Sequence, residues 1–372
     1  MKKRCRKRLI ALFIAIIISI IGQTGVILFV RSHYLDKNLN VEFKDVTTNM
    51  KTDDTKKVTI PENIASVIPS NNGRYLLYVI GKEAHIVNFE DGSDVTLEKA
   101  IIKDGDKNKK TMEKIIVNGD NTNFCWHDIE EKLVISQTNE DDVLGLRMYS
   151  YNPKVGNVER ALDYENQERT YDVSDYEQRV KNIRLNNAAT SIYLKLATQD
   201  RSNIYRLDIS YGIRKLELMS NNIGNYAILK SLDSIVYEEA NKGNLYISDK
   251  SVSKLIKING LNEIKLLGID NNLLYVAEME KGLVKSIYSA DLSDGYNSDS
   301  AIWNKINLDT PTVIENISIS RLGNLYYNDN EKRTVINLKT GSKTKYKGEF
   351  IGVYKDKLIS KEGITIYRKT VK

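Results

Sequence analysis

Three adjacent residues form the densest group of side chains in this sequence that could contact a ligand: Trp126, His127 and Asp128. They place an indole, an imidazole and a carboxylate in one predicted turn, and loops on a rigid scaffold often carry binding residues. The alternative is structural, with Trp126 completing a sheet core and the other two residues forming the turn. The triplet is the candidate ligand-binding site, and the pattern favours the structural alternative.

Catalytic chemistry has few residues to use, because the chain contains three histidines. His33 lies in a polar N-terminal segment, and His85 opens the alternating stretch HIVNF, which is typical of a structural histidine. A Ser-His-Asp triad through His127 would need a serine that the sequence does not place. The HExxH, GxSxG, CxxC and P-loop spacings are absent. We therefore predict no catalytic residue.

Residues 104–108 read DGDKN and resemble the opening of a calcium-binding loop. An EF-hand loop requires glycine at its sixth position, where this chain has Lys109. We therefore predict no metal site and no cofactor. The thiol of Cys125, in the apolar run Phe124-Cys125-Trp126, is expected to be buried and inert.

Residues 9–30 read LIALFIAIIISIIGQTGVILFV and contain no charged side chain. As a helix rising about 1.5 Å per residue, the segment spans roughly 33 Å, enough to cross a hydrocarbon layer of about 30 Å. It predicts a single transmembrane helix that anchors the chain in a lipid bilayer. The alternative is a cleaved signal peptide with an apolar core at residues 9–21, but hydrophobicity resumes at residue 26 and no Ala-x-Ala-like site is present.

The charges indicate the orientation. Residues 1–8 contain six Lys and Arg and no acid, so the positive-inside rule keeps this tag in the cytoplasm. Residues 31–55 are polar and indicate a stalk, and residues 56–372 then lie outside a bacterial cell membrane. Without the tag, the net charge of +6 falls to zero, since 49 basic and 49 acidic residues remain. This balance gives no electrostatic basis for binding nucleic acid.

Beyond residue 57, short runs of Val, Ile, Leu and Tyr alternate with clusters of Asn, Asp, Gly and Ser, which is typical of strands joined by tight turns. No long amphipathic helix follows residue 60. Short helices are conceivable at 111–117 and 171–180. The strands fall into six groups of four, at a spacing of roughly 45 residues, the repeat length of a propeller blade.

After residue 348, three strands remain, at 350–354, 357–360 and 364–369. The strand at 56–61 has no partner of its own and can supply the missing fourth, which closes a ring and removes open sheet edges. The sequence therefore predicts an all-β fold, a seven-bladed β-propeller of four-stranded antiparallel blades preceded by one transmembrane helix. A pair of sheet sandwiches or a solenoid would be the alternatives.

Residues 70–78, SNNGRYLLY, carry a recognisable element. They resemble the S-x-D-G-K-x-L-x-Y pattern of the TolB-type, WD40-like propeller repeats, with Asn72 in place of the usual Asp. Residues 269–275, IDNNLLY, resemble the same pattern less closely, because they lack its glycine. The resemblance implies the propeller superfamily and no particular member, and no Trp-Asp dipeptide marks true WD40 blades.

Two functions stay open at this point. The first is a non-catalytic binding or scaffold module for a protein, a peptide or an envelope glycan. It has no nucleic-acid partner, and it acts alone or within a larger membrane complex. The second is an envelope hydrolase or lyase that uses carboxylate and Tyr residues in the central channel. Carboxylates about 5–10 Å apart in a central pocket would favour glycoside chemistry, and a featureless or plugged channel would favour binding.

Overall fold

The computed structural model describes residues 54–371, with gaps at 103–109, 128–130, 139–144, 155, 161–170, 173–178, 186–190, 199, 209–211, 230–233, 241, 250–251, 298–300 and 321–322. Asp54–Lys372 forms one compact unit. The predicted tag, transmembrane helix and most of the stalk lie outside the described residues, as do Asp128 and the calcium-like stretch 104–108. Within the described part, no helix has the length and apolar character needed to cross a membrane.

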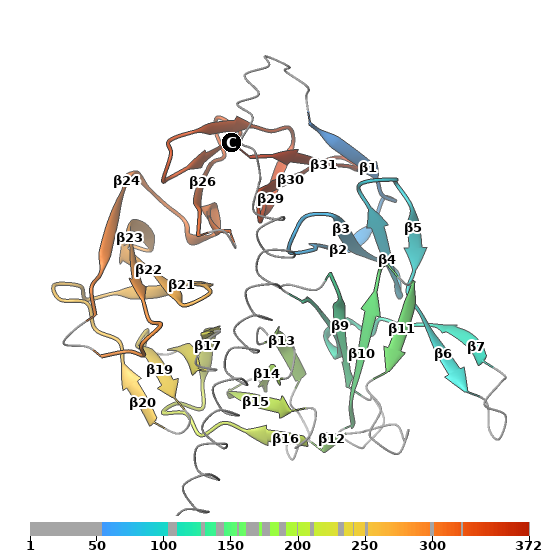
Figure 1. The fold of residues 1–372 in the computed structure, drawn as a ribbon, viewed down its shortest axis with the longest axis horizontal. Coiled ribbons are helices and arrows are strands. Elements are labelled where there is room, and N and C mark those ends of the chain that lie inside the picture. Colours follow the sequence, from blue (N-terminus) through green and yellow to red (C-terminus); the bar gives the residue numbers. More distant parts are fainter. Residues whose placement is uncertain are drawn as a thin grey trace, which may run out of the picture. The chain divides into compact units, whose positions relative to one another are not determined.

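The described strands form seven sheets that follow one another around a ring (Figure 1). Five sheets are four-stranded antiparallel meanders of consecutive strands. Blade 1 contains β2 (Ile64–Pro69), β3 (Tyr75–Ile80), β4 (Glu83–Asn88) and β5 (Asp94–Thr96). Blade 3 contains β13 (Arg179–Leu185), β14 (Ser191–Ala197), β15 (Ser202–Asp208) and β16 (Gly212–Lys215). Blade 4 contains β17 (Ile223–Leu229), β18 (Ser234–Glu239), β19 (Leu245–Asp249) and β20 (Val252–Leu255).

Blades 5 and 6 repeat the pattern. Blade 5 contains β21 (Ile264–Asp270), β22 (Leu273–Glu280), β23 (Leu283–Asp291) and β24 (Asn304–Thr312). Blade 6 contains β25 (Ile317–Ile319), β26 (Leu325–Asp329), β27 (Thr334–Asn337) and β28 (Lys343–Lys345). Two short 3-10 turns, η3 (Gly119–Asn121) and η4 (Ile314–Asn316), precede the first strands of blades 2 and 6. The predicted propeller of four-stranded antiparallel blades is confirmed, and the sandwich and solenoid alternatives are excluded.

Blade 2 is larger than the sequence predicts. Its own strands are β8 (Thr122–Trp126), β9 (Leu133–Thr138), β10 (Gly145–Asn152) and β11 (Asn157–Arg160). A hairpin of β6 (Glu98–Ile102) and β7 (Lys110–Lys114) extends the sheet beyond β11, and β12 (Tyr171–Asp172) pairs with β10. The short helix conceived at 111–117 is therefore wrong, because β7 finds a hydrogen-bonding partner in β6. The short helix predicted at 171–180 is wrong as well, because the described residues of that range belong to strands β12 and β13.

The N-terminal strand closes the ring, as predicted. Strand β1 (Lys56–Thr59) pairs antiparallel with β31 (Thr365–Thr370), beside β30 (Lys357–Glu362) and β29 (Glu349–Tyr354) in blade 7. The closure is reinforced by charge, because buried Arg368 donates to the Glu90 carboxylate of blade 1 at 2.8 Å and Lys56 donates to the same group. The hydrogen bonds from Lys56 and Arg368 lower the pKa of Glu90 to about 2.

Aromatic residues pack between the blades. Tyr78 and Tyr275 are buried in their second strands, as the sequence indicates. Their hydroxyls stay inside the protein, since Tyr78 donates to Asp94 at 2.5 Å and Tyr275 donates to the Gly323 carbonyl at 3.3 Å. Trp303 packs against the apolar cluster of blades 4 and 5.

Candidate functional site

The TolB-like element at residues 70–78 is a structural turn. Asn72 Oδ1 accepts hydrogen bonds from the Ser70 hydroxyl at 2.8 Å and from the Arg74 N–H at 2.9 Å, and Ser70 Oγ accepts the N–H of Tyr75. Gly73 has a positive φ of 67°, and a Cβ at this position would lie 2.7 Å from Cβ of Lys357. Glycine is needed here both for its conformation and for the close approach of blade 7.

The departure from the family pattern at Asn72 has a physical reason. The Asn72 side-chain N–H donates to the carboxylate of Glu131, just before the second strand of blade 2. Lys154 and Arg74 lie 3.1 Å and 3.9 Å from the same carboxylate. An aspartate at position 72 would turn a donor into a second negative charge, so asparagine suits this chain.

Trp126 and His127 hold blades 1 and 2 together. The Trp126 indole N–H donates to the Ile68 carbonyl at 3.0 Å, and the ring stacks on Tyr75 with centroids 6.1 Å apart. The carbonyls of Trp126 and His127 accept hydrogen bonds from Asn71 Nδ2 at 2.7 Å and 3.2 Å. Trp126 is 3% exposed and His127 is 4% exposed. These contacts show that Trp126 and His127 have a structural role between the two blades. Ligand binding by Trp126, His127 and Asp128 stays a prediction.

A cavity of about 580 Å³ lies where the first strands of the blades converge. Residues from β2, β8, β13, β17, β21, β25 and β29 all line it, so these are the inner strands of the ring. Trp126 belongs to the lining together with its neighbours Phe124 and Cys125, whereas His127 does not. Cys125 is half-buried at this wall and not fully buried as predicted.

Most residues of the cavity lining are aliphatic or aromatic, with Ile183, Leu267 and Ile317 as examples, but more of the surface that they present to the cavity is polar than apolar. Among the described lining residues, two carry charge: Arg184 on β13 and Glu315 on η4. A lone carboxylate cannot supply the acid and base pair that glycoside cleavage requires. The described residues also contain no group of three or more His, Cys, Asp or Glu side chains placed to hold a metal ion.

Two tyrosines in the lining are poorly suited to act as bases. Burial raises the pKa of Tyr354 to about 12, and burial also raises the pKa of Tyr226, whose hydroxyl donates to the Tyr193 carbonyl at 2.9 Å. A general base works best with a pKa near the working pH. The cavity is therefore better equipped to bind than to transfer protons.

Sequence reasoning missed Arg184 and Glu315. Each is a charged residue within or just before the apolar first strand of a four-strand group, in the stretches KNIRL and IENISIS. The first strand of every propeller blade borders the central channel. A charged residue in or beside such a strand was therefore the sequence signal that could have identified both residues.

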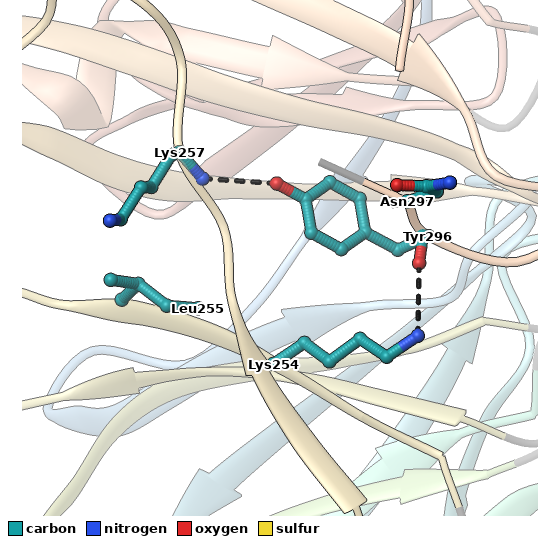
Figure 2. Close-up of a pocket in the computed structure, with 5 residues that line it drawn as sticks. All are labelled: Lys254, Leu255, Lys257, Tyr296 and Asn297. Carbon is teal, nitrogen blue, oxygen red and sulfur yellow. Dashed lines mark hydrogen bonds between the residues drawn. The ribbon is translucent and has the colours of Figure 1, made fainter. Parts of the chain in front are cut away.

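A second hollow, of about 400 Å³, lies at the rim between blades 4 and 5. The long loop after β23 inserts buried Tyr296 beside the outer strand of blade 4. Tyr296 accepts hydrogen bonds from Lys257 N–H at 3.0 Å and from Lys254 Nζ at 3.5 Å (Figure 2). The two lysine ammonium groups point to opposite sides of the tyrosine (Figure 2), so they do not converge on one ligand.

No known protein family and no curated protein matches the sequence. Among solved structures, an oligogalacturonate lyase from Vibrio parahaemolyticus is similar at 12% identity and TM-score 0.53, over 85% of this chain and 91% of that chain. The WD40 propeller domain of Doa1 is similar at 9% identity and TM-score 0.48, over 85% and 95%. TolB from Acinetobacter baumannii is similar at 12% identity and TM-score 0.41, over 84% and 65%. The seven sheets of this chain, arranged around a ring, confirm the propeller fold that the resemblance at residues 70–78 implies.

Proposed function

We propose that this chain is a membrane-anchored propeller that binds a partner outside the cell membrane and performs no catalysis. The observation that carries the proposal is the central cavity, about 580 Å³ in volume and lined by all seven blades. This size lies within the range of about 300–1,000 Å³ that is usual for ligand sites. Its lining presents both polar and apolar surface, which suits recognition of a ligand.

The proposed anchor is the apolar segment at residues 9–30, with the basic tag at residues 1–8 in the cytoplasm. Strand β1 begins at Lys56, so residues 31–55 would tether the propeller at the rim of blade 7. The partner would then be a protein, a peptide or a glycan of the cell envelope.

Catalysis is the less supported function. The lyase among the similar structures shares the fold at 12% identity, and function on a shared fold depends on the site. The described lining of the cavity offers Glu315 as its carboxylate and tyrosines of raised pKa.

Site-specific photo-cross-linking in the native envelope tests binding at the cavity. A photoreactive phenylalanine analogue replaces Phe124 in the cavity wall, and a matched control places it at Val252, 60% exposed on the outer strand of blade 4. We expect a discrete cross-linked product from position 124 and none from position 252. Identical product patterns from the two positions, or no product from position 124, would contradict the proposal.

Cysteine labelling in intact cells tests the anchor. Ile302, 80% exposed, is replaced by cysteine and treated with a membrane-impermeant maleimide, with Cys5 of the tag as the internal control. We expect labelling at position 302, protection of Cys5 until the cells are lysed, and a purified chain that retains residues 1–30. Protection at position 302 or loss of residues 1–30 would refute the anchored topology.

A further inference from the structure

The two charged residues of the cavity face it without ion-pair partners of their own. Arg184 and Glu315 are both exposed, and no ion pair joins either one to another described residue. The Arg184 guanidinium lies over the Tyr226 ring, 6.0 Å from its centroid, a contact that holds the cation at the wall. Neither charge takes part in an ion pair with a described residue, and both line the cavity, so both are accessible to a ligand there.

The two charges lie toward opposite ends of the channel. Each blade is a meander of four antiparallel strands, so its fourth strand ends on the same face of the ring as the one where its first strand began. The inner strand of every blade therefore starts at that face. Arg184 is the penultimate residue of β13, near the exit end. Glu315 precedes β25, at the entry end. The channel is thus positive toward one end and negative toward the other.

Asn182 adds a hydrogen-bond acceptor on the same strand. It lies two residues before Arg184, which places both side chains on one side of the strand, and both line the cavity. Its Oδ1 atom is buried and receives no hydrogen bond from the described residues. A buried acceptor of this kind suits a ligand that brings an N–H group.

We infer that the cavity binds a short, extended peptide with apolar side chains between its ends, which presents an acidic group to Arg184 and a basic group to Glu315. This inference rests on the proposed function and specifies its ligand. The aliphatic residues of the lining fit apolar side chains, and its polar surface, with the amide of Asn182, fits the peptide backbone. A fatty acid would leave Glu315 without a cation, and an uncharged glycan would leave both charges of the cavity without a partner.

Four hexapeptides with blocked termini and a shared Leu-Ala-Leu-Ala core test the inference. Their end residues are Glu and Lys, Glu and Glu, Lys and Lys, or Gln and Gln. Binding to the full chain in detergent is measured by calorimetry. We expect the peptide with one Glu and one Lys to bind at least tenfold more tightly than each of the other three.

Charge reversal should change the preference in a way that damage to the fold cannot mimic. With Arg184→Glu, the doubly basic peptide becomes the tightest ligand, and with Glu315→Lys the doubly acidic one does. Arg214→Glu, an exposed arginine on the outer strand of the same blade, is the control and should leave the order unchanged.

Equal binding of all four peptides, or an order that the two reversals leave unchanged, overturns the inference and leaves the proposed function standing. Cross-linking at position 124 without any peptide binding likewise overturns the inference alone. No peptide binding and no cross-linking would overturn both.

Discussion

The charges at the ring closure and the charges in the central cavity are organised in opposite ways. At the closure, Arg368 is 5% exposed and shares the Glu90 carboxylate with Lys56 across blades 7 and 1. In the cavity, Arg184 and Glu315 are exposed and form no ion pair among the described residues. The closure charges therefore stabilise the ring, whereas the cavity charges are available for recognition. Substitutions at the two places should separate stability from binding.

The largest effect is expected at the closure. Glu90→Gln leaves the buried Arg368 guanidinium without its carboxylate and should lower the free energy of unfolding by about 2 kcal/mol. Urea unfolding followed by circular dichroism measures this change. Glu349→Gln, an exposed glutamate in the same blade as Arg368, is the control and should change stability by less than about 0.5 kcal/mol. Equal losses of unfolding free energy in the two variants would show that the charge at the closure stabilises the fold no more than an exposed surface charge does.

The closure should also be sensitive to acid. Because the native pKa of Glu90 is lowered to about 2 from 4.5, its ionised form stabilises the fold fully above pH 4.5. This contribution disappears as the pH falls toward 2. The difference in melting temperature between the wild type and Glu90→Gln should therefore be constant above about pH 5 and shrink below it. A difference that grows on acidification would contradict this assignment.

A smaller effect is expected where blade 1 meets blade 2. Asn72→Asp restores the usual residue of the TolB-type pattern, yet it places a second carboxylate against Glu131 and should cost about 1 kcal/mol. Lys154 and Arg74 moderate the repulsion. In a double-mutant cycle, Glu131→Gln should recover most of the loss. Additive effects of the two substitutions would show that the side chains do not interact.

The smallest effect on stability is expected in the cavity. Arg184→Gln and Glu315→Gln should each change the free energy of unfolding by less than about 0.5 kcal/mol, because both side chains are exposed and form no ion pair with a described residue. The same urea titration provides the measurement. A loss comparable to that of Glu90→Gln would mean that the cavity charges support the fold, and it would weaken the case for a ligand.

The sequence predicted the ring and its closure because strand patterns and turns are local, and because one strand was missing from the last group. It predicted the pairing of residues 56–61 with the C-terminal strands. The hairpin β6–β7 was missed, since β7 reads KTMEK, a mostly charged stretch without strand alternation, and the sequence indicated a short helix there.

The ion pairs of Glu90 and the grouping of charges in the cavity bring together residues that are far apart in the chain, so the sequence did not predict them. Glu90 and Arg368 are separated by 278 positions, and no spacing in one sequence relates them. Arg184 and Glu315 share a site because two inner strands enter from one face of the ring, which requires the closed topology.

The pairing of β1 with β31 also bears on biosynthesis. The segment Lys56–Thr59 is among the first parts of the propeller to leave the ribosome, and its partner Thr365–Thr370 is among the last. Contacts this distant in sequence slow folding, because a long loop must close before they form. A nascent chain would carry an incomplete blade until synthesis is nearly finished, so a chaperone that shields the unpaired strand edges would raise the yield of the native protein.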